Sequence, residues 1–338
     1  MRRTVLPPEL LGLLISGRGV FLAAEAAAAG VSADRLQRLV RTRLLDRVGK
    51  GAYAATDELA AASPWASHAI RTRGFVMSRR THTLAAGWSA VALRGLPALG
   101  QPPELPTGVQ PSRTGHGTRL THFGIVHARE LLSEHQGRYA GCPIVSKAWM
   151  VVDLARGADR TAALVVADAV VHRGTARRRL QGALDQMCGW PGSDAAAWVV
   201  QHAAGGSESA LETLGRVACI DNGLPIPLSN VWVGPGYPLY RVDHLWPWHW
   251  VVAQADGALK YRGRDPALVI AHEKDREWHL RRLGLDVVRY GWQLAAFRRA
   301  ELAARFQAVL ADNPVRPTPI QWWPTDNPFI GQDGQIVA

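Results

Sequence analysis

The sequence predicts a multi-domain α/β protein with distinct N-terminal and C-terminal domains and a connector domain between them in the sequence. Its 338 residues are a length typical of two or three domains. Near the N-terminus, short helical segments and a glycine break precede a basic helix and a glycine-centred pair of strand-like segments. Near the C-terminus, a helix, two strand-like segments, a charged helix and a third strand-like segment follow one another. We therefore expect an N-terminal domain over residues 1–60, a mixed α/β connector over 61–200, an α/β domain over 201–311 and a proline- and tryptophan-rich tail over 312–338.

Three helices are predicted in the first domain. Pro7 and Pro8 suit the first turn of a helix, and the alanine-rich stretch 21–29 favours a second helix. Ser32 is a suitable N-cap for a third helix over residues 33–43, because its hydroxyl can accept a backbone N–H. The third helix has apolar residues on one face and arginines around the other.

Residues 44–53 follow this basic helix. Their sequence, with glycines at its centre, predicts two short strands joined by a turn. The order of helix, helix, glycine turn, basic helix and basic wing is that of a winged helix-turn-helix. In that fold the third helix enters the major groove of DNA and the wing contacts phosphate. The candidate DNA-binding residues are Arg35, Arg38, Arg41, Arg47 and Lys50. The alternative is a helical subdomain whose arginines are simply solvated.

The stretch "GVFLAAEAAAAGVSADRLQRLVRTRLLDRVGKGAYA", residues 19–54, carries a Gly-Val start, an Ala-Gly-Val-Ser turn, an Arg-Leu-Val helix end and a Gly-x-Tyr close. It resembles the N-terminal domain of the AbiEi family of antitoxins. Two stretches of the connector, "WSAVALRGLP" and "SKAWMVVDLAR", resemble the middle of AbiEi-like actinobacterial proteins. The resemblance implies an antitoxin that represses its own operon. Double-stranded DNA, including the operator of a cognate toxin gene, would then be its partner.

The connector contains one predicted loop and a basic cluster. Residues 100–117 are rich in Pro, Gly, Thr and Ser, which predicts a loop, and residues 147–156 predict a helix. The cluster Arg177, Arg178 and Arg179 lies on another predicted helix. These arginines either contact phosphate or form a solvated helix face.

The C-terminal domain holds the candidate chemical site. Asp243 lies on a strand-like segment, and Gln254 and Asp256 are two residues apart on the next, so that they share a face. Lys260 follows this second strand, and Glu212 lies on a preceding helix. A helix, a pair of strands, a helix and a strand form the core order of the PD-(D/E)XK nuclease fold. Such sites use acidic groups on adjacent strands to bind Mg²⁺ and a lysine to orient water or offset charge.

Four ordered motifs, "RVDHLWP", "QADGALKY", "EKDRE" and "GLDVVRY", span about a hundred residues of this domain. They resemble the nuclease-like family related to the very-short-patch DNA repair endonucleases. The resemblance implies functional positions at Asp243, Asp256 and Lys260, with Glu212 as the helix acid. It also places Lys274, Arg276 and Glu277 on the charged helix beside the site.

One position departs from that family, because Gln254 stands where the family has glutamate. An amide oxygen is a neutral and weaker ligand for a hard cation. Two readings stay open. Either Asp256 compensates, and Asp243, Asp256 and Gln254 hold Mg²⁺ in an active endonuclease, or the domain binds metal poorly and the protein is an antitoxin-like regulator. A role in protein interaction alone is the third possibility.

The composition fits a nucleic-acid partner. Lys and Arg number 39 against 28 Asp and Glu, a net charge of +11, which favours nucleic acid before membrane. The alternative explanation of the positive net charge is a genome whose codon usage favours Arg and Ala. Cys142, Cys188 and Cys219 are too few and too scattered for a disulfide framework or a zinc ribbon. This use of cysteine fits a reducing, cytoplasmic setting, which we expect for the protein. No apolar stretch reaches the ~20 residues of a membrane helix.

Overall fold

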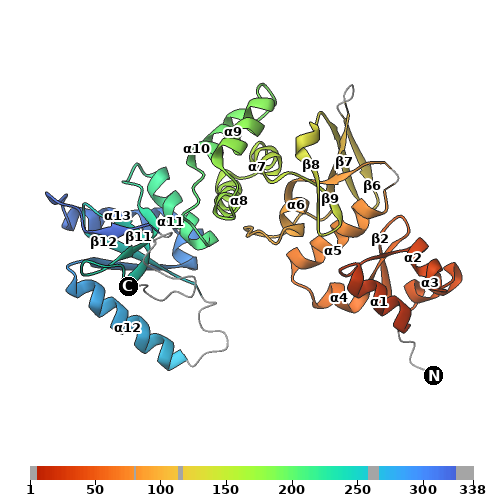
Figure 1. Cartoon of the computed structure of the whole chain (residues 1–338), viewed down its shortest axis with the longest axis horizontal. Helices are drawn as coiled ribbons and strands as arrows, with labels where there is room; N and C mark the ends of the chain where they lie inside the picture. Colours follow the sequence, from red (N-terminus) through yellow and green to blue (C-terminus); the bar gives the residue numbers. More distant parts are fainter. Residues whose placement is uncertain (1–5, 80, 113–116, 258–265, 325–338) are drawn as a thin grey trace. The chain divides into compact units, whose positions relative to one another are not determined.

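The computed structural model of the chain describes residues 6–79, 81–112, 117–257 and 266–324, with the backbone alone for 266–273. The structure is mixed α/β and contains three sheets in its described part (Figure 1). The chain divides into two compact units. The first comprises residues 1–170 and 175–202, and the second comprises residues 171–174 and 203–338. The domain boundaries that the sequence suggested at residues 60, 200 and 311 remain predictions.

The first unit begins with a small α/β module. Its elements are α1 (Pro8–Ser16), β1 (Phe21–Leu22), α2 (Ala23–Ala28), α3 (Ala33–Arg41), β2 (Leu45–Gly49), β3 (Ala52–Ala55) and α4 (Thr56–Ala61). The three strands form an antiparallel sheet in the order β1-β3-β2. This arrangement is that of a winged helix-turn-helix, with α3 as the third helix and the β2–β3 hairpin as the wing (Figure 1).

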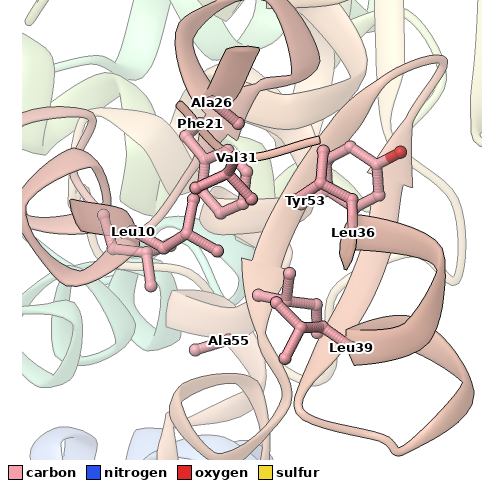
Figure 2. Close-up of a cluster of buried hydrophobic side chains, with 10 residues drawn as sticks. Leu10, Phe21, Ala26, Val31, Leu36, Leu39, Tyr53 and Ala55 are labelled. Carbon is pink, nitrogen blue, oxygen red and sulfur yellow. The ribbon is translucent and has the colours of Figure 1, made fainter. Parts of the chain in front are cut away.

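The main apolar cluster of this module joins α1, β1, α3 and the wing (Figure 2), and a smaller cluster includes Val48 and Leu59. Leu10 of α1, Phe21 of β1 and Leu36 and Leu39 of α3 are all buried in the main cluster. The ring of Phe21 stacks on that of Tyr53, with their centroids 5.6 Å apart. Burial of these side chains is the main source of the module's folding stability, because each fully buried apolar side chain contributes roughly 1.5–3 kcal/mol to the free energy of unfolding.

The boundaries of two helices differ from the sequence prediction. The helix expected over residues 21–29 begins at Ala23, because Phe21 and Leu22 pair with Tyr53 and Ala52 as strand β1. The third helix ends at Arg41 rather than at residue 43, where Arg43 adopts a left-handed φ of 56°. The predicted N-cap is confirmed: the Oγ of Ser32 accepts the backbone N–H of Arg35 at 3.3 Å.

Helix α5 (Pro64–Met77) packs against the wing, and two glycines allow this close contact. A Cβ on Gly49 of β2 would lie 2.4 Å from the carbonyl oxygen of Gly74 in α5. A Cβ on Gly74 would lie 2.2 Å from Cγ2 of Val48. Any larger side chain at either position would push the wing away from α5.

The rest of the first unit is a six-stranded sheet with helices. The strands are β4 (Leu84–Ala85), β5 (Thr107–Pro111), β6 (Gly117–Thr121), β7 (Gly124–Arg129), β8 (Gln136–Tyr139) and β9 (Cys142–Val145), in the order β6-β7-β5-β4-β9-β8. The helices are α6 (Gly87–Leu93), the 3₁₀ turn η1 (Ser133–His135), α7 (Lys147–Ala155), α8 (Arg160–His172), α9 (Arg177–Gln186) and α10 (Ser193–His202). The helix predicted over 147–156 is confirmed as α7. The loop predicted over 100–117 is wrong at β5, which pairs with β4 and β7.

The second unit is a five-stranded sheet between helices. Its elements are α11 (Ala210–Asp221), β10 (Leu228–Val233), β11 (Tyr240–Trp246), β12 (Val251–Asp256), α12 (Pro266–Arg282), β13 (Asp286–Gly291), the π-helix η3 (Gln293–Phe297), α13 (Arg299–Asp312) and β14 (Trp322–Trp323). The strand order is β13-β12-β11-β10-β14. Strands β12 and β13 are parallel and the other neighbours are antiparallel. The predicted helices and the three predicted strands of this region are present, whereas β10 and β14 were not predicted.

Among the residues that the structure describes, no helix has both the length and the apolar character that crossing a bilayer requires.

Candidate nucleic-acid interface and acidic site

The basic residues predicted for DNA binding all lie on the surface of the winged helix. Arg35, Arg38 and Arg41 are exposed on α3, whereas Leu36 and Leu39 of the same helix are buried. Arg47 and Lys50 are exposed on the wing, where Gly51 makes the turn with a φ of 76°. Within the described part of the chain, none of these five basic side chains forms an ion pair. The helix and wing therefore present positive charge that is available for phosphate groups.

The predicted acidic site lies where strands β10 and β11 are irregular. The strands pair Ser229 with His244 and then Val231 with Val242, so that Asn230 and Asp243 stand between two regular pairs. Asn230 adopts a left-handed φ of 54°. The pairing of β11 with β12 runs from His244 to Trp246 and does not include Asp243. Instead of a strand partner, Oδ2 of Asp243 accepts the backbone N–H of Ala255 at 2.7 Å. Asp243 therefore substitutes for a missing backbone acceptor.

Glu212, the predicted helix acid, caps the start of α11. Its Oε1 accepts the Ser209 hydroxyl at 2.6 Å, and its Oε2 accepts the backbone N–H of Glu208 at 2.8 Å. In return, the Ser209 Oγ accepts the backbone N–H of Glu212 at 3.3 Å. The amide of Asn230 also donates to Oε2 and links α11 to β10. Ser-x-x-Glu is the spacing of a capping box. This spacing in the sequence therefore indicates that Glu212 caps the N-terminus of α11.

Burial controls the charge of Glu212. The side chain is buried, which raises its pKa above the ordinary value of 4.5, although the Ser209, Glu208 and Asn230 donors oppose this shift. The nearby Asp243 carboxylate raises the pKa further. The two acids expected in one site are therefore close enough to influence one another.

This raised pKa predicts a pH dependence of stability. Between pH 4.5 and the raised pKa, the folded chain binds more protons than the unfolded chain, so stability falls as pH rises through this window. Glu212→Gln removes that contribution. In urea unfolding, we expect wild type to gain stability relative to Glu212→Gln as the pH is lowered from neutrality to 4.5. A difference between the two proteins that is constant with pH would contradict this assignment.

Asp256, predicted as the compensating ligand, is held by an arginine. The Nε and Nη2 of Arg289 each donate to its carboxylate at 2.7 Å. The Nη1 of the same arginine lies 3.4 Å from Oε2 of Glu277. This bidentate arrangement joins β12, β13 and α12, and it supplies Asp256 with a positive partner from the chain itself.

Gln254 is buried, and none of the described residues forms a hydrogen bond with its side chain. Its side chain is 2% exposed, and neither Oε1 nor Nε2 has a partner in the described part of the chain. The hollow beside it, lined in part by Arg276, Glu277 and Arg289, has no room for a water molecule. A buried amide without partners costs about 1–3 kcal/mol.

Gln254→Leu is therefore expected to raise the free energy of unfolding, by about 1–3 kcal/mol, because leucine fills a similar volume without polar atoms. Chemical denaturation of purified protein measures this change. Gln136→Leu is the matched control, since the amide of Gln136 donates to the carbonyl oxygen of Leu131 at 2.9 Å, and its loss should be destabilising. Destabilisation by Gln254→Leu would mean that the amide has a partner in solution.

The remaining predicted residues do not complete a metal site. Lys260 lies outside the described residues. Lys274 is exposed on α12, and Arg276 donates to the carbonyl oxygen of Arg241. No group of three His, Cys, Asp or Glu side chains in the described chain is arranged to hold a metal ion. Because Glu212, Asp243 and Asp256 are engaged by protein donors and Gln254 is neutral, the described residues do not fit Mg²⁺. Their catalytic and metal-binding roles remain predictions.

A buried histidine–tyrosine pair, which sequence reasoning missed, supports this region. The Nε2 of His244 lies 2.7 Å from the hydroxyl of Tyr290, and both side chains are buried. Burial lowers the pKa of His244 to about 3, so the ring is neutral. Gly215 of α11 lies against the pair: a Cβ there would be 2.2 Å from the tyrosine oxygen and 2.8 Å from Nε2 of His244.

Fold and surface charge define the N-terminal part as a winged-helix module with a basic third helix. Residues 9–56 match the family model described as a transcriptional regulator, AbiEi antitoxin. The match covers the module from the start of α1 to the end of β3.

Two curated relatives are similar to a larger part of the chain. They are the uncharacterized proteins Rv2248 and MT2308 of Mycobacterium tuberculosis strains H37Rv and CDC 1551, each 33% identical over 168 residues. The alignment covers 48% of this chain and 59% of each relative, so the chain matches little more than half of the length of these relatives. Among solved structures, the RV2827C protein of M. tuberculosis is 15% identical, with a TM-score of 0.37 over 59% of this chain and 78% of that one.

Proposed function

We propose that the chain is a DNA-binding transcriptional regulator of the AbiEi antitoxin kind, which contacts double-stranded DNA through its winged helix. The observation that carries the proposal is the set of exposed basic residues on α3 and the wing, which have no ion-pair partner in the described chain. The segment that matches the regulator family, residues 9–56, contains all five of these residues. The operator of the protein's own operon, with a cognate toxin gene, is the proposed target.

The C-terminal unit is proposed as a nuclease-like domain without a working metal site. Its order α11, β10, β11, β12, α12, β13 supports the nuclease-like reading, since this is a helix, a meander of strands, a helix and a parallel strand. The hydrogen bonds of Glu212 and Asp243 and the ion pair of Asp256 support the loss of metal binding. Active Mg²⁺-dependent cleavage of DNA remains the alternative function. The order of helices and strands in the C-terminal unit is the observation that favours this alternative.

Footprinting on the DNA upstream of the protein's own gene tests the regulatory function. We expect wild type to protect a short segment, with an affinity that falls steeply as salt rises because phosphate contacts release counterions. A reporter placed behind that DNA should be repressed when the protein is supplied. Equal, weak binding to every fragment and an unrepressed reporter would contradict the proposal.

A further inference from the structure

The outward face of α1 forms an apolar groove together with the start of α4. Ile15 is 81% exposed and Leu11 is 43% exposed, one turn apart on the same helix. Leu6 also lines the groove, and the hollow has a volume of about 650 Å³. Such an arrangement places a protruding aliphatic side chain directly beside a space that accepts one.

Charged residues of both signs surround this groove. Arg18 stands at the end of α1, and Asp57 and Glu58 stand at the start of α4. All three are exposed, and none forms an ion pair in the described chain. The two carboxylates make the face unsuitable for a polyanion such as DNA. A protein surface with an apolar centre and complementary charges at its rim fits better.

We propose that this face is the interface of a homodimer. In a two-fold contact the same patch meets itself, so each partner must offer both a protrusion and a hollow, and both signs of charge. Ile15 and the groove satisfy the first condition. Arg18 facing Asp57 and Glu58 satisfies the second. A single patch that is complementary to itself identifies a second copy of this chain as the occupant.

The proposed interface leaves the DNA-binding face free. Leu10 of α1 and Leu36 and Leu39 of α3 enter the core cluster from opposite sides (Figure 2). The exposed surfaces of the two helices therefore face different ways. A dimer formed through α1 would present two α3 helices to two DNA half-sites. This role of the dimer rests on the proposed DNA-binding function.

Sedimentation velocity of the full chain tests the interface. Over roughly 1–100 µM, wild type is expected to pass from monomer to dimer, and Ile15→Glu is expected to weaken dimerisation at least about tenfold. Ile226→Glu is the matched control, because Ile226 is 54% exposed in the second unit. Arg18→Glu should also weaken the dimer, and Arg18→Glu combined with Glu58→Arg should recover it.

Three results would overturn the proposal: a wild-type monomer throughout this range, a dimer unaffected by Ile15→Glu, or equal weakening by Ile226→Glu. If Ile15→Glu fails to fold, as judged by circular dichroism, the charge variants decide the question. Binding of the protein to a DNA duplex with a single half-site distinguishes failure of the proposed dimer from failure of the proposed DNA-binding function. A monomeric wild type that still binds DNA would refute the dimer alone.

Discussion

Replacing Gly215 with alanine is expected to lower the free energy of unfolding of the second unit by about 3 kcal/mol or more. Overpacking a core costs about 1–3 kcal/mol, and separating a buried hydrogen-bonded pair adds a similar amount. Both effects apply, because the new methyl group would lie 2.2 Å from the Tyr290 hydroxyl and 2.8 Å from Nε2 of His244. Urea unfolding followed by tryptophan fluorescence measures the loss.

The control for this substitution is a helical glycine with space around it. Gly182 lies inside α9, and no atom would come within 4 Å of its added Cβ. Gly182→Ala should therefore stabilise by about 0.5–1 kcal/mol through helix propensity alone. If Gly215→Ala were as harmless as Gly182→Ala, the packing of the His244–Tyr290 pair against α11 would be wrong.

Replacing Arg38 and Arg41 together with alanine is expected to weaken operator binding by about 2–6 kcal/mol, more than tenfold in Kd, since each arginine contact is worth about 1–3 kcal/mol. Both side chains are exposed on α3, so folding should be unaffected. Fluorescence anisotropy with a labelled duplex measures the affinity at fixed salt.

The control must remove the same charge elsewhere. Arg305 is an exposed arginine on α13 that is ion-paired to Glu301 at 2.9 Å. Arg305→Ala combined with Arg281→Ala changes the net charge by the same amount and should leave the affinity nearly unchanged. If the control lost as much affinity as the α3 variant, binding would reflect general charge rather than the winged helix.

The winged helix could be predicted because its signals are local. Ser32 before an amphipathic helix and the glycine turn of the wing act over a few neighbouring residues, and the structure contains both. Strand β1 was missed because two residues have no periodicity of their own. Phe21 and Leu22 become a strand only by pairing with Ala52 and Tyr53, which lie thirty residues away. Strand β5 was missed because its Gly, Gln and Pro residues are typical of a loop, and it becomes a strand only by pairing with β4 and β7.

The acidic site could be predicted only in part. The sequence placed Glu212 and Asp243 in the same region. Burial is the main cause of the raised pKa of Glu212, and the Asp243 carboxylate adds to it. The sequence could not show what those acids contact. The pairing of Asp256 with Arg289 depends on the parallel register of β12 and β13, which a whole helix separates along the chain. By contrast, the Ser-x-x-Glu spacing of Ser209 and Glu212 is local, and it indicates a helix N-terminus from the sequence alone.

Metal-independent DNA binding can be tested by incubating an end-labelled operator duplex with the full chain in Mg²⁺, in Mn²⁺ and in EDTA, and resolving the products on native and denaturing gels. We expect a retarded, uncut duplex under all three conditions, because the proposed contacts of α3 and the wing need no metal and the acids of the second unit accept hydrogen bonds from protein donors. Asp243→Asn serves as the parallel variant, since an amide oxygen can still accept the Ala255 N–H. Cleavage that requires metal and disappears in Asp243→Asn would contradict the proposed loss of metal binding and establish a nuclease.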